Sequence, residues 1–265
     1  MNPKKLVPLA LIALAAASDA AVARAETPSP RSAAEIVAAA DQVRNPAAPF
    51  RVSLALTEYR NGEAHDTVNL AVHSKIDAST QQFRNVVRYV GPPRDVGKLV
   101  LLNGSSMWFY DPASKASVRI SAQQRLIGQA SDGDVLTVNL AHDYTPKLLG
   151  EESITDADKQ PRTAWHLELA AATPDAAYTR LESWIEKETF RPIKSKFYSD
   201  SGRLLKVAYY RKYEEQLGAV RPTETIIVDA IDSHLVTKIA SSEFHSEQVQ
   251  DAWFQREYLP RFSAE

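Results

Sequence analysis

The chain is built largely from short runs in which apolar and polar residues alternate with a period of two, and this pattern constrains its fold more than any other feature. Over residues 50–57, phenylalanine, valine and leucine occupy every second position, with arginine, serine, alanine and threonine between them. This alternation is typical of a strand with one buried face, because successive side chains of a β-strand point to opposite sides. The sequence therefore predicts a mainly β protein.

Residues that favour turns separate these runs. Asn61-Gly62 and Asp200-Ser201-Gly202 are hairpin signals, and Pro92-Pro93 ends the run that covers residues 82–90. Runs of the same kind continue to residue 241. We expect about 11 antiparallel strands in a single domain, and a set of that size must either close or pair two sheets.

Three segments depart from the alternation and have a helical pattern. Ser32 and Glu35 have the spacing of a capping box, and apolar residues at helical spacing follow them, which predicts a helix over residues 33–44. Residues 123–129 and residues 248–259 predict two further short helices. A strongly curved antiparallel sheet, covered on its concave face by these helices, accommodates every predicted element.

The first 25 residues have the features of a secretory signal peptide. Lys4 and Lys5 precede an apolar run over residues 6–17, and Ala23-Arg24-Ala25 offers small residues at the cleavage site. Residues 26–265 are then the mature chain, and none of its segments reaches the ~18 uncharged apolar residues of a transmembrane helix. An exported chain without cysteine fits the periplasm of a Gram-negative bacterium.

Composition excludes several classes of function. The chain has no cysteine, which rules out disulfide scaffolds, thiolate metal sites and cysteine nucleophiles. Its 31 Lys+Arg against 33 Asp+Glu argue against a nucleic-acid partner. The sequence contains no HExxH, GxSxG, GxGxxG or Walker pattern, so we expect no metal site, no cofactor and no enzymatic activity.

Two groups of basic residues leave two interpretations open. Each group lies on one predicted strand and its flanking turn. These residues either contact an anionic head group or form the solvent-facing side of a strand. The residues are Arg84, Arg88 and Arg94 in the first group, and Arg203, Lys206, Arg211 and Lys212 in the second.

The segment from residue 180 to residue 213 resembles a known family. Its residues 184–194 read WIEKETFRPIK, and residues 197–204 read FYSDSGRL. This resembles the strand–turn–strand core of the LolA-like superfamily, in the branch named outer-membrane lipoprotein-sorting protein. Further segments agree in order over nearly all of the mature chain: residues 34–46, 95–99, 108–112, 118–121, 125–134 and 252–259.

The resemblance implies a half-open, LolA/LolB-like β-barrel with an apolar concave face under a helical lid. It implies a periplasmic carrier that binds acyl chains of lipoproteins or lipids and moves them towards the outer membrane. Possible partners are an inner-membrane transporter of the RND/MMPL type and an outer-membrane acceptor. The alternative is a periplasmic lipid sensor or regulatory module, the use that RseB makes of this fold. Carriers of the superfamily hold their lid with a barrel arginine, and no arginine of this sequence can be assigned that part.

Strand parity predicts the wall of the cavity, because side chains two residues apart share a face. Whether Met107 and Phe109 or Trp108 and Tyr110 face inward stays open. The predicted wall consists of Phe50, Val52, Leu54, Leu56, Val68, Leu70, Val72, Leu99, Leu101, Trp165, Leu167 and Leu169.

A movable cover is predicted over residues 123–134. Leu126 and Ile127 would close on the acyl chain, and Ser131-Asp132-Gly133 could act as a hinge. The alternative is a fixed helix that caps the barrel.

Overall fold

The computed structural model describes residues 31–173 and 176–263, and the predicted signal peptide lies outside the described residues. Thirteen strands form one antiparallel sheet in the order β6-β5-β4-β3-β2-β1-β15-β14-β13-β12-β11-β10-β9. The strands are β1 Phe50–Arg60, β2 Glu63–Ile76, β3 Phe83–Gly91, β4 Leu99–Asn103, β5 Ser106–Asp111, β6 Ala116–Arg119, β9 Tyr144–Thr155, β10 Pro161–Ala171, β11 Arg180–Glu186, β12 Pro192–Tyr198, β13 Leu204–Gln216, β14 Ala219–Asp229 and β15 Leu235–Ser246.

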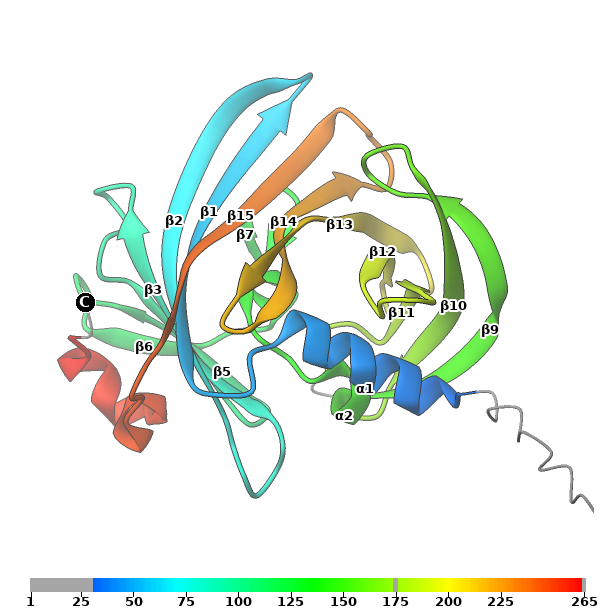
Figure 1. Cartoon of the computed structure of the whole chain (residues 1–265). Helices are drawn as coiled ribbons and strands as arrows, with labels where there is room; N and C mark the ends of the chain where they lie inside the picture. The colour runs from blue at the N-terminus through cyan, green and yellow to red at the C-terminus, as the bar shows by residue number, and fades with distance from the viewer. Residues whose placement is uncertain (1–30, 174–175, 264–265) are drawn as a thin grey trace, which may run out of the picture. The chain divides into compact units, whose positions relative to one another are not determined.

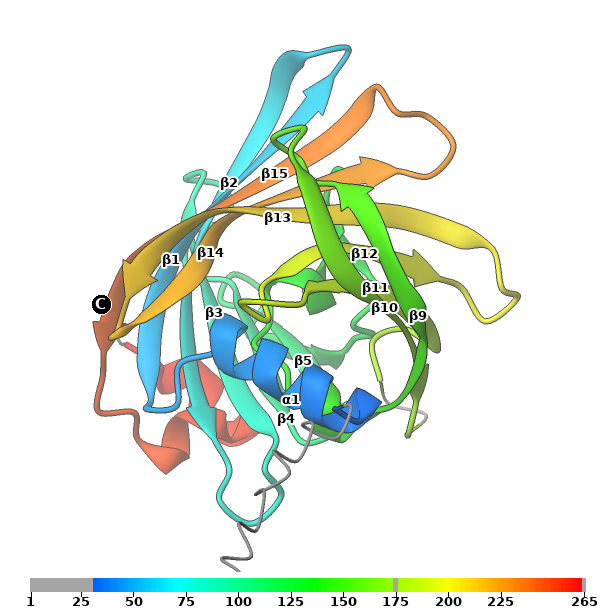
Figure 2. The same ribbon diagram turned by 45° about the vertical axis from the view of Figure 1, so that its right-hand side comes forward.

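The mainly β prediction is confirmed, and two details of the predicted barrel differ. The sheet has 13 strands where about 11 were expected. It also does not close: within the described ranges, β6 and β9 are its two edges. The sheet instead curls so that its two ends lie on opposite sides of a concave face (Figures 1 and 2).

The predicted N-terminal helix is present as α1, Ala33–Arg44. Ser32 caps it, with the Glu35 amide donating to Ser32 Oγ and the Glu35 carboxylate accepting from the Ser32 amide. The helix lies across the open side of the curl, beside the short helix α2, Leu140–Asp143 (Figure 1). None of the helices within the described residues is long and apolar enough to cross a lipid bilayer.

Residues 123–129 do not form the predicted helix. They contribute β7, Arg125–Ile127, which pairs with β8, Ala130–Ser131, and a 3₁₀ turn, η1, follows over Asp132–Val135. Gly128 has a φ of 53° and forms the turn between the two strands. The local helical pattern does not prevail here, because main-chain groups of this segment form hydrogen bonds to the large sheet, as described below.

The C-terminal segment also differs from the predicted helix over residues 248–259. It forms two 3₁₀ helices, η2 Asp251–Phe254 and η3 Arg256–Arg261. Phe254 and Leu259 are each 1% exposed and pack against Val86 and Leu101 of the sheet. This segment therefore covers the convex side of β3–β5, away from the concave face.

Strand register makes the concave face continuous across the sheet. Leu56 lies opposite Ile239 of β15 and Val68 of β2. Further along, Ala208 of β13 lies opposite Ile227 of β14. Residues directly opposite in an antiparallel pair point to the same side of the sheet. The hydrophobic cluster on this face therefore extends from β5 to β12.

Candidate functional site

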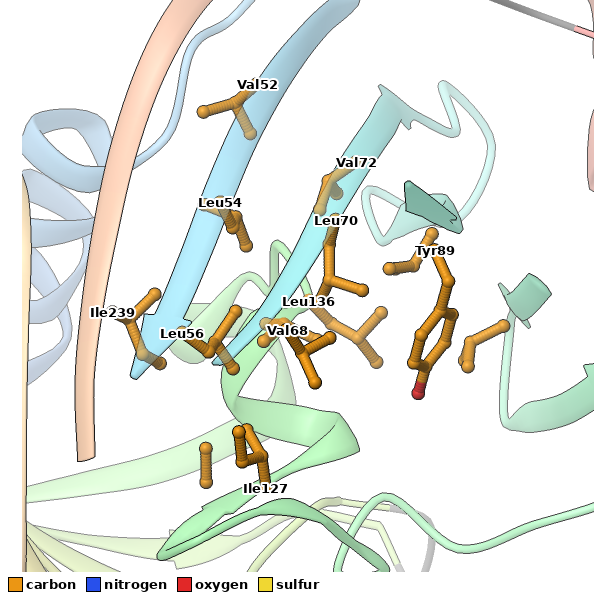
Figure 3. Close-up of a cluster of buried hydrophobic side chains, with 14 of the residues drawn as sticks. Val52, Leu54, Leu56, Val68, Leu70, Val72, Tyr89, Ile127, Leu136 and Ile239 are labelled. Atoms are coloured by element: carbon orange, nitrogen blue, oxygen red, sulfur yellow. The ribbon is translucent and has the colours of Figure 1, made fainter. Parts of the chain in front are cut away.

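The first hairpin supplies the centre of the concave face, as strand parity predicts. Its inward-facing side chains are all buried and belong to one hydrophobic cluster, shown in Figure 3. Leu56 and Leu70 have no exposed surface. The inward orientation is confirmed for Phe50, Val52, Leu54, Leu56, Val68, Leu70 and Val72.

The predicted residues of β10 face the same side of the sheet but pack against a different element. Trp165, Leu167 and Leu169 are buried against Ile36 and Val37 of α1. The amphipathic helix thus occupies the part of the face that these three side chains form.

Leu99 and Leu101 do not belong to the concave face, so the prediction for these two residues is wrong. They pack on the convex side with Phe254 and Leu259 of the C-terminal segment. The register explains the difference, because Val100, not Leu99, lies opposite Val87 of β3. The same parity determines which side chains of β5 face inward. Met107 and Phe109 belong to the inner cluster, and Trp108 and Tyr110 belong to the outer one.

We call residues 123–136 the cover segment, because its β7–β8 hairpin and η1 turn lie on the concave face. Ile127, Ala130, Val135 and Leu136 are buried in the same cluster as the first hairpin, and Leu126 packs against it. Figure 3 shows Ile127 and Leu136 beside the side chains of β1 and β2. The cover segment therefore fills the groove that the predicted wall residues form.

Polar contacts, as well as apolar ones, hold the cover segment to the sheet. The main-chain amide of Gln129 donates to Thr237 Oγ1 of β15 at 2.7 Å. Lys206 of β13 donates from Nζ to the Gln129 carbonyl oxygen at 3.2 Å and to Ser131 Oγ at 3.1 Å. The same ammonium forms an ion pair with the carboxylate of Asp134.

Lys206, Asp134 and Tyr178 form a buried polar cluster, which we call the Lys206 cluster. The side chains of Lys206 and Asp134 are 5% and 8% exposed. Tyr178 Oη donates to Asp134 Oδ1 at 3.1 Å, and the Ser131 amide donates to Asp134 Oδ2 at 2.7 Å. Each charge is thus paired and hydrogen-bonded, which is the condition under which buried charges are tolerated.

Asp132 is a second buried carboxyl of the cover segment, 3% exposed. Burial, together with the nearby charge of Asp134, raises the pKa of Asp132 to about 7. Loss of its proton near neutral pH therefore places a charge in a site that is nearly closed to water. The cover segment contains a group that opposes its own docking as the pH rises.

Two cavities lie on either side of residues 133–138. One has a volume of about 140 Å³, and its walls include Phe83, Leu102 and Leu136. The other has a volume of about 120 Å³, and its walls include Tyr210 and Ile227. Both are smaller than the roughly 300–1,000 Å³ of typical ligand sites. Of the wall residues predicted from the sequence, all described in the structure, none lines either cavity.

The two cavities share Gly133, Leu136, Val138, Asp143 and Ala177 as lining residues. Residues 133–138 therefore form the partition between the two cavities. Outward movement of this partition would join the two cavities.

Gly128→Ala should loosen the cover segment. A methyl group at this position would lie 2.4 Å from Thr237 Oγ1, and the positive φ disfavours any residue with a Cβ atom. We expect the free energy of unfolding to fall by about 1–3 kcal/mol, the range found for overpacked sites. Chemical denaturation measures this change. Gly62→Ala is the control, because its φ is also positive but nothing lies within 4 Å. An equal loss in both variants would show that contact with Thr237 is unimportant.

Comparison with solved structures places this architecture in a family. A LolA superfamily protein from Nitrosomonas europaea is 32% identical in sequence, with a TM-score of 0.77. The match covers 86% of this chain and 100% of that chain. The chain belongs to the LolA superfamily. A family model described only as "-like: Uncharacterized protein" matches residues 81–261 of this LolA-superfamily chain. No curated protein matches the sequence.

Two more distant structures share the fold. A putative outer-membrane lipoprotein-sorting protein domain from Vibrio parahaemolyticus is 18% identical, with a TM-score of 0.71, over 86% of this chain and 98% of that one. A DUF1329 family protein from Desulfovibrio piger is 21% identical, also with a TM-score of 0.71, over 86% of this chain and 97% of that one.

The resemblance implied a barrel arginine that holds the lid, and the sequence allowed no arginine to be assigned that part in this LolA-superfamily chain. A lysine, Lys206, bonds the sheet to the cover segment. The sequence suggested a head-group contact or a solvent face for Lys206, yet its side chain is buried and faces inward. Its parity with the buried Ala208 on the same strand was the signal that could have identified it.

Proposed function

We propose that this LolA-superfamily protein is a periplasmic carrier that binds acyl chains of lipoproteins or lipids and moves them towards the outer membrane. The observation that carries the proposal is the continuous apolar concave face closed by a cover segment. The Lys206 cluster holds that segment to the sheet, and the segment separates the two apolar cavities. A fixed core needs no charged pair at this place, whereas a cover that opens exposes these groups to water, where they are well solvated.

The energetics of carriage favour this arrangement. Each buried methylene contributes about 0.8 kcal/mol, so a ten-carbon stretch gains about 8 kcal/mol. Association costs of several kcal/mol and the displacement of Ile127 and Leu136 reduce this gain. The result is binding that is useful but reversible, as a carrier requires.

Native mass spectrometry of protein purified from the periplasm of the cells that produce it tests the proposal. We expect a population that carries a lipid or an acylated peptide, released by mild organic extraction. Protein that is uniformly free of lipid, and that also fails to bind a fluorescent fatty acid, would contradict carriage. The RND/MMPL-type transporter and the outer-membrane acceptor implied by the resemblance stay predictions.

Substitution of both Leu126 and Ile127 by serine should strengthen acyl binding by about 1–3 kcal/mol, because these side chains fill the groove in the closed state and leave it when a chain binds. The substitution removes apolar contacts that stabilise only the closed state. Titration with a fluorescent fatty acid measures the change in affinity. The matched control is Val90→Ser with Val118→Ser, since these side chains are 44% and 50% exposed on β3 and β6. An unchanged affinity in the Leu126/Ile127 variant would remove both residues from the site.

A further inference from the structure

A polar pocket lies next to the cover segment, separate from the two apolar cavities. Its volume is about 290 Å³. The cover segment forms one wall, and the start of β13 and the end of β14 form the other. Its polar lining includes Arg125, Gln129, Ser131, Arg203, Lys206 and Asp229.

The charges of this pocket favour an anion. Arg125 and Arg203 are exposed, and within the described residues neither guanidinium has a hydrogen-bond or ion-pair partner. Lys206 also lines the pocket and is buried. The carboxylate in the lining is Asp229, whose Oδ1 accepts the amides of Ile231 and Asp232 at 2.9 Å each. The pocket therefore holds two cations without partners and one carboxylate, whose Oδ1 already accepts two main-chain amides.

The pocket and the 120 Å³ cavity adjoin at the Lys206 cluster. Tyr178 lines both of them. Asp134 lines the apolar cavity, and its partner Lys206 lines the polar pocket. A molecule with an apolar chain and an anionic end can therefore place one part on each side of this cluster.

We infer that the polar pocket binds the anionic head group of the lipid cargo, a phosphate or carboxylate, while the acyl chain occupies the concave face. This inference rests on the proposed carrier function and adds the chemical class of the head group. Arg125 and Arg203 bind the anion first, since arginine donates in a fork that matches both groups. The anion then competes with Asp134 for Lys206, so cargo binding itself weakens the attachment of the cover segment.

Displacement of a fluorescent fatty acid by short-chain lipids tests the inference. The probes are dihexanoyl phosphatidylglycerol, dihexanoylglycerol and inorganic phosphate, with both lipids used below their micellar concentrations. We expect the anionic lipid to bind about tenfold more tightly than the uncharged lipid, equivalent to one charge-assisted contact. The preference should shrink as salt is added.

The variant Arg125→Gln with Arg203→Gln should bind both lipids with nearly equal affinity and keep the wild-type affinity for dihexanoylglycerol. The control Arg119→Gln with Lys147→Gln removes the same charge from exposed positions on β6 and β9 and should keep the preference. Equal affinities in the wild-type protein would overturn the inference and leave carriage standing. Inorganic phosphate that binds as tightly as the anionic lipid would overturn the assignment to a lipid head group. Failure of every lipid to bind would contradict the proposed function itself.

Discussion

Lys206→Met should lower the free energy of unfolding by about 3–5 kcal/mol, the cost of removing one partner of a buried ion pair. The substitution leaves the Asp134 carboxylate, 8% exposed, without its cation. It also removes the two hydrogen bonds from Nζ to Gln129 and Ser131. We expect the molecule to reduce this cost by releasing the cover segment into water. Chemical denaturation measures the loss, and hydrogen exchange of residues 123–136 reports the release.

A double variant separates the ion pair from the bulk of the side chain. Lys206→Met with Asp134→Asn carries no unpaired buried charge, and the asparagine still accepts the Tyr178 hydroxyl. It should regain most of the lost stability, because replacement of both partners is far less costly than removal of one. Lys147→Met on exposed β9 is the surface control. Wild-type stability and unchanged exchange in Lys206→Met would show that the cluster does not hold the cover segment.

Asp132→Asn should stabilise the protein at pH 8 by up to about 4 kcal/mol and leave it nearly unchanged at pH 4. The folded protein raises the pKa of Asp132 from 3.8 to about 7, chiefly through burial. The protonated form therefore stabilises the fold fully below about pH 4, and this contribution is lost as the pH rises through about 7. Asparagine stays neutral throughout, so the difference between variant and wild type should grow between these two values.

Unfolding by denaturant at a series of pH values measures this difference. Asp200→Asn is the matched control, because Asp200 lies exposed in the hairpin turn between β12 and β13. A constant difference between Asp132→Asn and wild type from pH 4 to pH 8 would contradict the raised pKa. In the expected case, the cover segment docks more firmly in acid than at neutral pH.

The strands and their inward faces could be predicted because the relevant signal is local. Leu54 and Leu70 are two positions in a period-two pattern, and their burial follows from that pattern alone. The capping box of α1 lies within four residues. Each of these features depends on side-chain direction or local hydrogen bonding, which the sequence displays directly.

The cover segment and part of the site depend on contacts that no local pattern contains. The turn at Gly128 faces Thr237, more than 100 residues away, and this contact replaces the predicted helix. Leu99 and Leu101 alternate like the inner residues of the first hairpin, but the register with β3 turns them outward. From the sequence alone Lys206 resembles a surface residue, and only the fold places Asp134 beside it. Contacts between segments that lie far apart in the sequence decide all three.

The central claim is that the cover segment leaves the concave face when an acyl chain binds. Hydrogen exchange of residues 123–136 with and without a bound fatty acid tests it most directly, because local opening appears as loss of amide protection. We expect exchange in this segment to become much faster in the bound state, while β1 and β2 stay protected. A fatty acid that binds while residues 123–136 remain as protected as these strands in both states would contradict the account.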